Sequence, residues 1–215
     1  MTNQSVITNE VVSQMPRTKE QNEKIREERR AEILTAAIEL FARDGFADTS
    51  VSAVAKAAGV SHGTVFLYFP TKEDLFRAAV LEPLLTWEAR FMSTLQSEGS
   101  PLERIERFVR QQVMDVAAQE SYIRLVHYVL GLRTRFPDIA QEIFGYSSRQ
   151  MAALAPVVAE GQAQGQFAPG DPMGIAVTYF AWLNGAPLVY LTPPDDPTWE
   201  YAVGFAMRIF GSVKP

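Results

Sequence analysis

Apolar residues first recur with a regular spacing in the stretch that runs from residue 26 to residue 45. Behind the charged segment REERRAE, their separation of three or four positions is that of one face of a helix. These positions are Ile33, Leu34, Ala37, Ile38, Leu40 and Phe41. Gly45 follows them and is suited to end the helix. Residues 1–24 are polar and lack any such pattern, so they are predicted to be a disordered tail.

Two short helices are predicted next, each preceded by a hydroxyl residue that can cap it. Thr49 or Ser50 can accept a hydrogen bond from the first free amides of the segment VSAVAKAA. Ser61 can do the same for the segment HGTVFLY, which Pro70 stops. A longer helix is then predicted to run to about residue 95.

The rest of the chain also shows helical periodicity, interrupted by glycine and proline. The predicted segments are roughly 101–119, 121–134, 137–165, 172–192 and 196–212. No run of alternating β-branched residues predicts a strand. We therefore expect an all-α fold.

The two short helices have the features of a helix-turn-helix unit. Ala55 is small enough to let two helices cross closely, and Gly59 can adopt the left-handed conformation that a tight turn needs. The second helix of such a unit lies in the major groove of DNA. Gly63 falls on the first turn of that helix, where a missing side chain lets the backbone approach phosphate. A glycine needed only for helix packing would give the same pattern.

The segment GFADTSVSAVAKAAGVSHGTVFLYFPTKEDLF, residues 45–76, closely resembles the N-terminal domain of TetR-family transcriptional regulators. This resemblance implies a three-helix DNA-binding domain, followed by a helical domain for ligand binding and dimerisation. It also implies contacts with DNA by a set of hydroxyl, aromatic and basic residues and one glycine. With the two capping candidates included, the expected set is Thr49, Ser50, Ser61, His62, Gly63, Thr64, Leu67, Tyr68 and Lys72.

Two residues depart from the family pattern. Phe66 stands where a tyrosine is common, which removes one hydroxyl group. Leu67 stands where a polar residue is usual, and it could either contact a thymine methyl group or simply pack. His62 occupies a variable position, and we expect it to read a base.

A basic segment lies at the start of the first helical region and consists of Lys19, Lys24, Arg26, Arg29 and Arg30. Glutamates interleave with these residues. The mixture favours a solvated face over a phosphate-binding surface, except at one or two of the arginines.

The last predicted helix, TWEYAVGFAMRIFG, is apolar on nearly every side, and residues 172–194 before it carry no charge. A single buried face does not account for this composition, whereas two buried faces do. We therefore expect both helices to contact a second copy of the chain, as the resemblance also implies. Burial between protein surfaces is favoured over a bilayer because Asn184, Gly185 and several prolines interrupt the apolar run. The expected interface residues are Trp182, Trp199, Val203, Met207 and Phe210.

The resemblance further implies a ligand pocket in the second domain. The candidates are aromatic or polar side chains on different predicted helices: Trp87, Phe91, Phe108, Tyr122, His127, Phe144 and Asn184. Each of them also fits the role of an ordinary core residue. His127 and Asn184 are the stronger candidates because buried polar groups need partners.

The composition of the chain excludes several kinds of reactive and metal-binding site. The chain of 215 residues has no cysteine, which excludes thiolate chemistry, disulfides and cysteine-based zinc sites. It also lacks a phosphate-binding glycine loop and a nucleophile motif, so we expect neither an enzyme nor a cofactor or metal. The net charge of −5 is uninformative about DNA binding, which depends on local charge. The polar start MTNQSVITNE lacks the features of a secretory signal, so a cytoplasmic location is expected.

The expected organisation is a tail over 1–24, a helix-turn-helix domain over 25–77 and a ligand-binding and dimerisation domain over 78–215. The expected function is that of a ligand-responsive, DNA-binding transcriptional regulator. It would be a homodimeric repressor that a small, largely apolar effector releases from a palindromic operator. Two alternatives stay open: a dimeric DNA-binding protein without an effector, and a helical enzyme, which has the least support.

Overall fold

The computed structural model describes residues 18–189, 193 and 195–211, so most of the expected tail lies outside the described residues. The described part consists of helices joined by short connections, which confirms the all-α fold class. The helices are α1 (Lys19–Asp48), α2 (Val51–Ala57), α3 (His62–Tyr68), α4 (Lys72–Leu95), α5 (Pro101–Ala118), α6 (Glu120–Gly131), α7 (Pro137–Ala163), α8 (Pro172–Gly185), the 3₁₀ helix η2 (Ala186–Leu188) and α9 (Thr198–Ile209).

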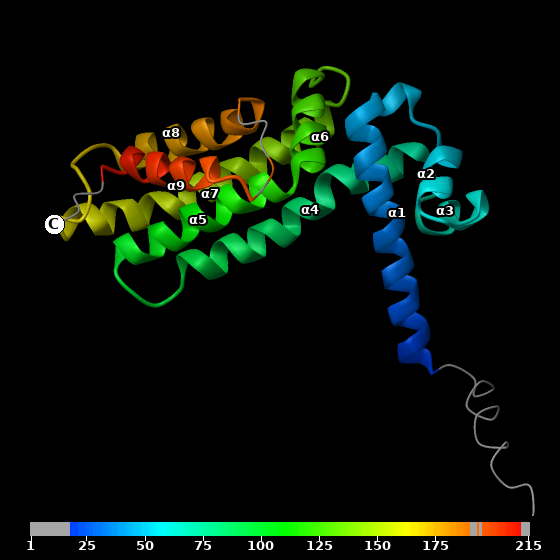
Figure 1. The fold of residues 1–215 in the computed structure, drawn as a ribbon, viewed down its shortest axis with the longest axis horizontal. Coiled ribbons are helices and arrows are strands. Elements are labelled where there is room, and N and C mark those ends of the chain that lie inside the picture. The colour runs from blue at the N-terminus through cyan, green and yellow to red at the C-terminus, as the bar shows by residue number, and fades with distance from the viewer. Residues whose placement is uncertain (1–17, 190–192, 194, 212–215) are drawn as a thin grey trace, which may run out of the picture.

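The molecule is elongated, with α2 and α3 at one end and a bundle of α5, α7, α8 and α9 at the other (Figure 1). Helix α4 begins beside α2 and α3 and runs into the bundle, where it packs against α7. Helix α1 packs against both α4 and α6. The small N-terminal unit therefore has two connections to the larger domain, through α4 and through α6.

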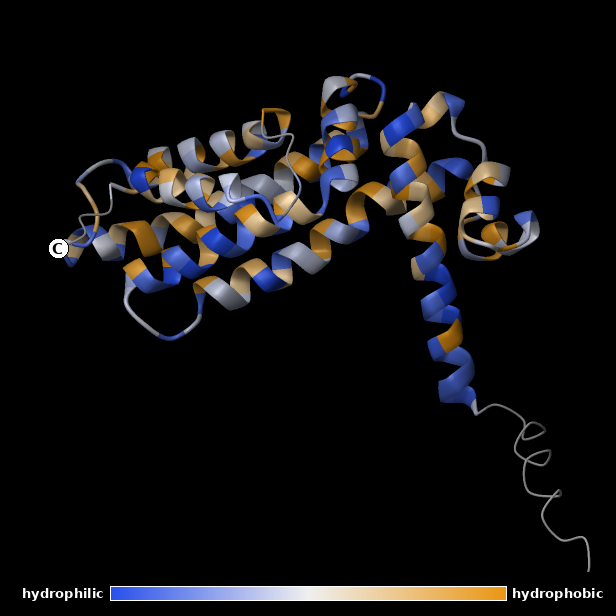
Figure 2. Cartoon of the chain, in the orientation of Figure 1, coloured by the Kyte–Doolittle hydropathy of each residue, from blue (hydrophilic) through white to orange (hydrophobic). Residues whose placement is uncertain are grey.

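The first helix begins earlier than the apolar pattern predicted. A capping box starts it: Thr18 Oγ1 accepts from the amide of Gln21, and the Gln21 side chain accepts from the amide of Thr18. Residues 19–24 are consequently helical, not part of a tail. The apolar pattern did not predict a helix here because this part of α1 is hydrophilic (Figure 2) and so has no apolar periodicity.

An aromatic cluster joins the end of α1 to the second domain. Gly45 has a φ of 76°, and a Cβ atom there would come within 3.0 Å of the Tyr128 ring from α6. The Tyr128 hydroxyl accepts a hydrogen bond of 3.0 Å from the amide of Phe46. The Phe46 ring in turn packs against the rings of Phe76 and Phe136, with centroid separations of 5.0 and 5.7 Å. The turn that leads into α2 and α3 is thus held by α6.

The uncharged segment that begins at residue 172 forms a shorter helix than predicted. Helix α8 ends at Gly185, and η2 follows, because Pro187 cannot continue the hydrogen-bond ladder of an α-helix. The last part of the predicted segment, residues 190–192, lies outside the described residues. Of the helices that the structure describes, none combines the length and the apolar character needed to cross a membrane.

Candidate nucleic-acid interface and regulatory domain

Helices α2 and α3 cross over a tight turn, as the sequence predicted. Ala55 is buried at the crossing, together with Val54 and Val65. Gly59 has a φ of 64°, the left-handed conformation that lets the chain reverse direction between the helices. The predicted helix-turn-helix unit is therefore confirmed down to its small residue and its turn glycine.

The two short helices are capped by serines. Ser50 Oγ accepts a hydrogen bond of 3.1 Å from the amide of Ala53, and Ser61 Oγ accepts one of 3.1 Å from the amide of Thr64. The hydroxyls of Ser61 and Thr64 also lie 2.7 Å apart and share a hydrogen bond. Both serines are exposed, so each marks a helix start that solvent or a DNA backbone can reach.

Thr49 does not have the role expected for it. Its side chain is only 2% exposed, and its hydroxyl donates to the backbone carbonyls of Leu40 and Gly45 at 3.2 and 2.8 Å. Ser50 takes the capping position instead. The prediction that Thr49 caps α2 and contacts DNA is therefore wrong. Thr49 stabilises the end of α1 through these two hydrogen bonds, and its buried side chain does not reach the surface.

The outer face of α3 is exposed and uncharged. His62 and Gly63 are exposed, and the ring of His62 packs edge-on against Phe66 with centroids 4.9 Å apart. Leu67 is 78% exposed, which rules out packing as the reason for a leucine there. No residue of α3 is an aspartate, glutamate, lysine or arginine. The face thus offers apolar and hydroxyl groups to a partner.

Basic side chains border this face. The guanidinium of Arg26 lies 5.9 Å from the centre of the Tyr68 ring, so α1 supplies a positive charge beside the end of α3. Lys72 Nζ donates to the carbonyl of Ala47 at 3.2 Å and lies 4.6 Å from the centre of the Phe46 ring. This hydrogen bond uses one of the three donors of the ammonium group and leaves others for a phosphate.

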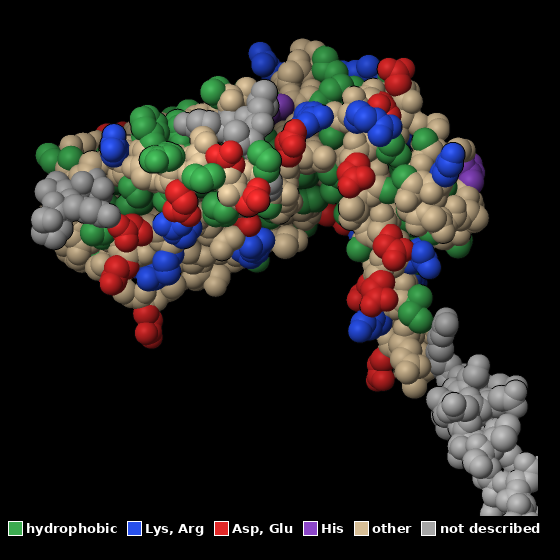
Figure 3. All heavy atoms as spheres, in the orientation of Figure 1, with side chains coloured by type: hydrophobic (Ala, Val, Ile, Leu, Met, Phe, Trp, Pro, Cys, Tyr) green, Lys and Arg blue, Asp and Glu red, His purple; other side chains and the backbone are tan. Residues whose placement is uncertain are grey.

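The basic segment of α1 is mostly paired with acids. Lys24 and Arg29 pair with glutamates of the same helix. Arg30 makes two hydrogen bonds of 2.5 and 2.6 Å to the carboxylate of Glu82 on α4, which raise the pKa of its guanidinium. Acidic and basic side chains alternate along α1 (Figure 3). These pairings support the expected solvated face, with Arg26 as the arginine that lies beside α3.

Comparison with known proteins places this unit in a family. Residues 33–79 match the family model described as bacterial regulatory proteins, tetR family. The helix-turn-helix part of the chain belongs to the TetR family of transcriptional regulators. This span covers the second half of α1, all of α2 and α3, and the start of α4, which are the elements described above.

Whole-chain comparisons agree with this membership. The TetR-family chain is 25% identical to the fatty acid metabolism regulator protein of Bacillus subtilis over 67% of its own length and 74% of that protein. It is 26% identical to the transcriptional regulator RutR of Escherichia coli, over 69% of each chain. A putative transcriptional regulator from Saccharomonospora viridis, solved in complex with choline, has the same fold, with a TM-score of 0.72 at 21% identity over 87% of this chain and all of that one. The relatives are regulators and not enzymes, which confirms the expected class.

In this TetR-family regulator, the expected ligand residues of α4, α5 and α6 form a closed aromatic cluster. Phe91 and Phe108 are buried and meet edge to face, with centroids 5.0 Å apart. Trp87 is half-buried and packs edge-on against Tyr122 at 5.2 Å. The Tyr122 hydroxyl donates to the carbonyl of Val80 at 2.8 Å, and burial raises the pKa of this tyrosine. These four side chains therefore form two edge-to-face pairs, which are adjacent along α4 because Trp87 and Phe91 are one helical turn apart.

The two polar candidates and Phe144 lie elsewhere. His127 is half-buried; burial lowers the pKa of its imidazole, and a hydrogen bond with the backbone of Asn184 partly opposes that shift. The side chain of Asn184 is exposed, and its amide donates back to the carbonyl of Phe180 at 2.7 Å, so it is not the buried, partner-seeking group that was expected. Phe144 is 52% exposed on α7, and it does not belong to the aromatic cluster.

Most of the expected dimer residues point into the protomer and are not exposed to a second chain. Trp199, Val203, Met207 and Phe210 are buried in the core of the protomer itself, and Trp182 is half-buried. The exposed apolar side chains of this region form a different set: Met173, Val177, Leu188, Val189, Tyr201 and Phe205. Hydrophobic side chains gather on the surface over α8 and α9 in Figure 3. A dimer through α8 and α9 stays a prediction, and these six are the large apolar side chains that the described part of this region exposes.

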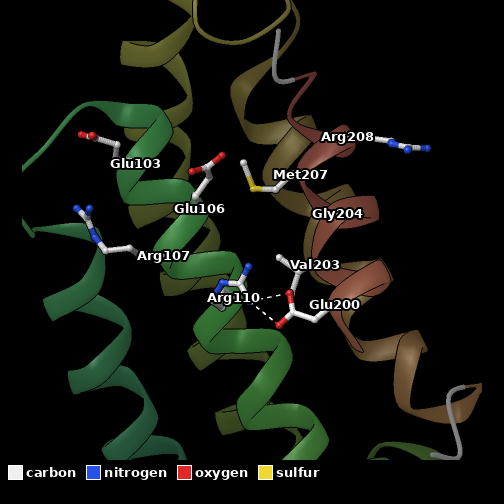
Figure 4. A pocket seen from close by; sticks show the side chains of 9 residues that line it. All are labelled: Glu103, Glu106, Arg107, Arg110, Glu200, Val203, Gly204, Met207 and Arg208. Atoms are coloured by element: carbon white, nitrogen blue, oxygen red, sulfur yellow. Dashed lines mark hydrogen bonds and ion pairs between the residues drawn. The ribbon is translucent and has the colours of Figure 1, made fainter. Parts of the chain in front are cut away.

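A charged groove of about 680 Å³ lies between the exposed edges of α5 and α9 (Figure 4). Arg110 on α5 makes hydrogen bonds of 2.6 and 2.8 Å to the carboxylate of Glu200 on α9. Glu106, Arg107 and Arg208 also line it. Acidic and basic groups alternate here, so the groove does not have the apolar lining that was expected of the effector site.

Proposed function

We propose that this protein is a homodimeric repressor that binds a palindromic operator and is released by a small, largely apolar effector. The observation that carries the proposal is the exposed, uncharged outer face of α3, with Leu67 78% exposed on it. A helix-turn-helix unit presents that face to the major groove. Operator binding implies a cytoplasmic location.

The proposed DNA contacts follow from the geometry of α2 and α3. Ser50, Ser61 and Thr64 lie at exposed or half-exposed positions at the two helix starts, where backbone amides and hydroxyls suit phosphate oxygens. His62 and Leu67 lie on the outer face of α3, where base edges are read. Tyr68, with Arg26 beside it, and Lys72 would contact the backbone at the other end of α3.

Dimerisation is proposed through the exposed apolar face of α8 and α9. Tyr201 and Phe205 are one turn apart on α9, and Phe205 packs on Trp182 of α8 with ring centroids 5.8 Å apart. A continuous apolar surface of this kind marks an interaction site in soluble proteins. A two-fold dimer would place two α3 helices on successive major-groove faces of a palindrome.

The effector is proposed to bind in the second domain. The printed names of the relatives point to different chemistries, a fatty acid for one and choline for another, so they do not define the effector of this chain. The aromatic side chains of α4, α5, α6 and α8 support a largely apolar molecule.

The proposed signal to DNA travels along α4 and α6. Pro83 lies inside α4, one residue after Glu82, whose ion pair with Arg30 joins α4 to α1. Trp87 lies one turn further along the same helix, in the aromatic cluster. An effector releases DNA only by the difference between its affinities for the two conformations, typically about 1–3 kcal/mol of coupling.

A binding assay tests the whole proposal. Fluorescence anisotropy with palindromic DNA from upstream of the gene should show much tighter binding than with random DNA. An effector found by thermal-shift screening should weaken operator binding, and operator should weaken effector binding by the same factor. Equal affinity for operator and random DNA would refute the regulator. A regulator whose melting temperature no metabolite raises would instead fit the alternative without an effector.

Leu67 should make the protein sensitive to thymine methyl groups. Replacing the thymines of one half-site by uracil removes only the methyl group, and the wild-type affinity should fall about fourfold for each contacted methyl, from about 0.8 kcal/mol per buried group of that size. Leu67→Ala should bind both DNAs equally, as measured by anisotropy. Leu85→Ala, which removes an exposed leucine of α4 instead, should retain the wild-type preference. If the wild type binds the uracil operator as tightly as the thymine operator, Leu67 does not read methyl groups.

A further inference from the structure

Tyr179, in the middle of α8, has a hydroxyl group without a hydrogen-bond partner. The side chain has no exposure to solvent. Among the buried side-chain oxygen and nitrogen atoms of the described residues, Tyr179 Oη is the one that makes no hydrogen bond. An unpaired buried hydroxyl destabilises a folded protein, whereas a phenylalanine would fill the same space without that cost. Packing alone therefore does not account for a tyrosine at this position.

Other buried tyrosines of the same domain do have partners. The Tyr122 hydroxyl donates to the carbonyl of Val80 at 2.8 Å. The Tyr146 hydroxyl accepts from the side-chain amide of Gln150 at 2.6 Å. The protein thus satisfies these hydroxyls internally, and the hydroxyl of Tyr179 is the exception.

The surroundings of Tyr179 are aromatic and come from three helical segments. The ring centroids of Phe108, Phe180 and Phe210 lie 5.5, 5.3 and 5.3 Å from that of Tyr179. These neighbours belong to α5, α8 and the end of α9. Burial raises the pKa of Tyr179 well above its usual value, so the phenol stays protonated and can donate a hydrogen bond.

Charged groups are missing from this part of the core. The polar side chains buried in the described part of the chain are Thr49, Gln112 and Gln150, and none of them carries a charge. Gln112 follows Phe108 by one helical turn, so it lies on the same face of α5. An ion placed here would lack a counter-charge, which makes its burial strongly unfavourable.

We propose that Tyr179 is the hydrogen-bonding anchor of the effector site, and that the effector is an uncharged, largely apolar molecule with a carbonyl-type acceptor. This inference rests on the proposed ligand-responsive function and adds the ligand class and its polar contact. The rings close the site in this structure, so the effector must displace some of them to enter. Because α8 also carries part of the exposed apolar face proposed for dimerisation, such a displacement reaches the surface that pairs the two DNA-binding units.

The first experiment measures melting temperatures without any ligand. Tyr179→Phe removes an unpaired hydroxyl and should raise the melting temperature by about 2–4 °C. Tyr122→Phe is the matched control, since it removes a hydroxyl that has a partner, and it should lower the melting temperature. A loss of stability in Tyr179→Phe similar to that of the control would mean that the hydroxyl is already satisfied, and it would overturn the proposal.

The second experiment measures the binding of three probes of similar size by titration calorimetry. Acetophenone presents a carbonyl, α-methylstyrene replaces the carbonyl oxygen by a methylene group, and benzoate carries a charge. The wild type and Tyr146→Phe, which removes a hydroxyl that already has a partner, should bind acetophenone about tenfold more tightly than α-methylstyrene, and Tyr179→Phe should bind the two equally. No binding of acetophenone, no preference in the wild type, or tighter binding of benzoate would each overturn the proposal.

Measurements of operator affinity show whether this inference or the proposed regulator function has failed. Tyr179→Phe should bind operator DNA like the wild type when no probe is present, because α8, which carries Tyr179, is remote from α2 and α3 (Figure 1). Acetophenone should weaken operator binding by the wild type more than by Tyr179→Phe. If the wild type does not distinguish operator from random DNA while the probe results hold, the regulator function fails and the ligand site remains.

Discussion

Phe205→Arg is expected to convert the proposed dimer into a folded monomer that binds operator DNA about 10²–10⁴ times more weakly. Phe205 is 49% exposed on α9 in the protomer, so an arginine there can reach water without disturbing the core. In a two-fold interface the same surface patch of both copies meets, which would bury two like charges in an apolar contact. The loss of affinity follows because each α3 would then bind its half-site alone.

Sedimentation velocity and anisotropy measure the two effects. Phe144→Arg is the matched control, because Phe144 is 52% exposed on α7 and lies outside the proposed face. It should leave both the dimer and operator binding unchanged. A dimeric Phe205→Arg, or a monomeric Phe144→Arg, would move the interface away from α8 and α9.

Val203→Arg is not equivalent to Phe205→Arg, although the two positions are close on α9. Val203 lies in the protomer core, so the much larger side chain of an arginine would disrupt its packing and should unfold the domain. Circular dichroism separates the two variants, since only Phe205→Arg should keep its helical signal.

Gly63→Leu is expected to lower operator affinity about a hundredfold without destabilising the free protein. Within the described structure, the nearest atom to a Cβ at Gly63 is Ser61 Oγ at 4.0 Å, so a side chain has room. On DNA, that side chain would stand between the start of α3 and the phosphates. The loss corresponds to one or two hydrogen bonds to a charged group, each worth about 1.5–3 kcal/mol. Anisotropy at constant salt measures it.

The smaller change Gly63→Ala should stabilise the free protein by up to about 1 kcal/mol, since alanine has less backbone entropy to lose in a helix.

Gly131→Leu is the control for Gly63→Leu, because it adds the same side chain at an open glycine of α6 instead of α3. It should leave operator binding unchanged. Wild-type affinity in Gly63→Leu would show that this glycine serves neither phosphate approach nor any other DNA contact.

Helix positions were predictable from the sequence because caps, breakers and apolar spacing are local properties. Ser61 caps α3, Gly59 makes the turn, and Ala55 sits at the crossing, as short stretches of sequence indicated. The first turns of α1 were an exception. They are held by a cap at Thr18 and by charged side chains, and neither produces an apolar pattern.

Side-chain direction on the last two helices was not predictable. Helix α9 is apolar on nearly every side, so the sequence alone does not distinguish its inner face from its outer face. Contacts with α5 and α8 decide it, and they bury Val203 and Met207 while leaving Tyr201 and Phe205 exposed.

By itself, the sequence determined the helical fold, the helix-turn-helix unit and the family, because these depend on neighbours within a few positions along the chain. Tertiary structure decided which polar groups have partners. Thr49 donates to the carbonyl of Leu40, Arg30 pairs with Glu82, and Tyr179 Oη has no hydrogen-bond partner, so these outcomes depend on which groups the folded chain brings together. Hydrogen bonds require contact within about 3.5 Å, and only the packed fold defines which distant groups come that close.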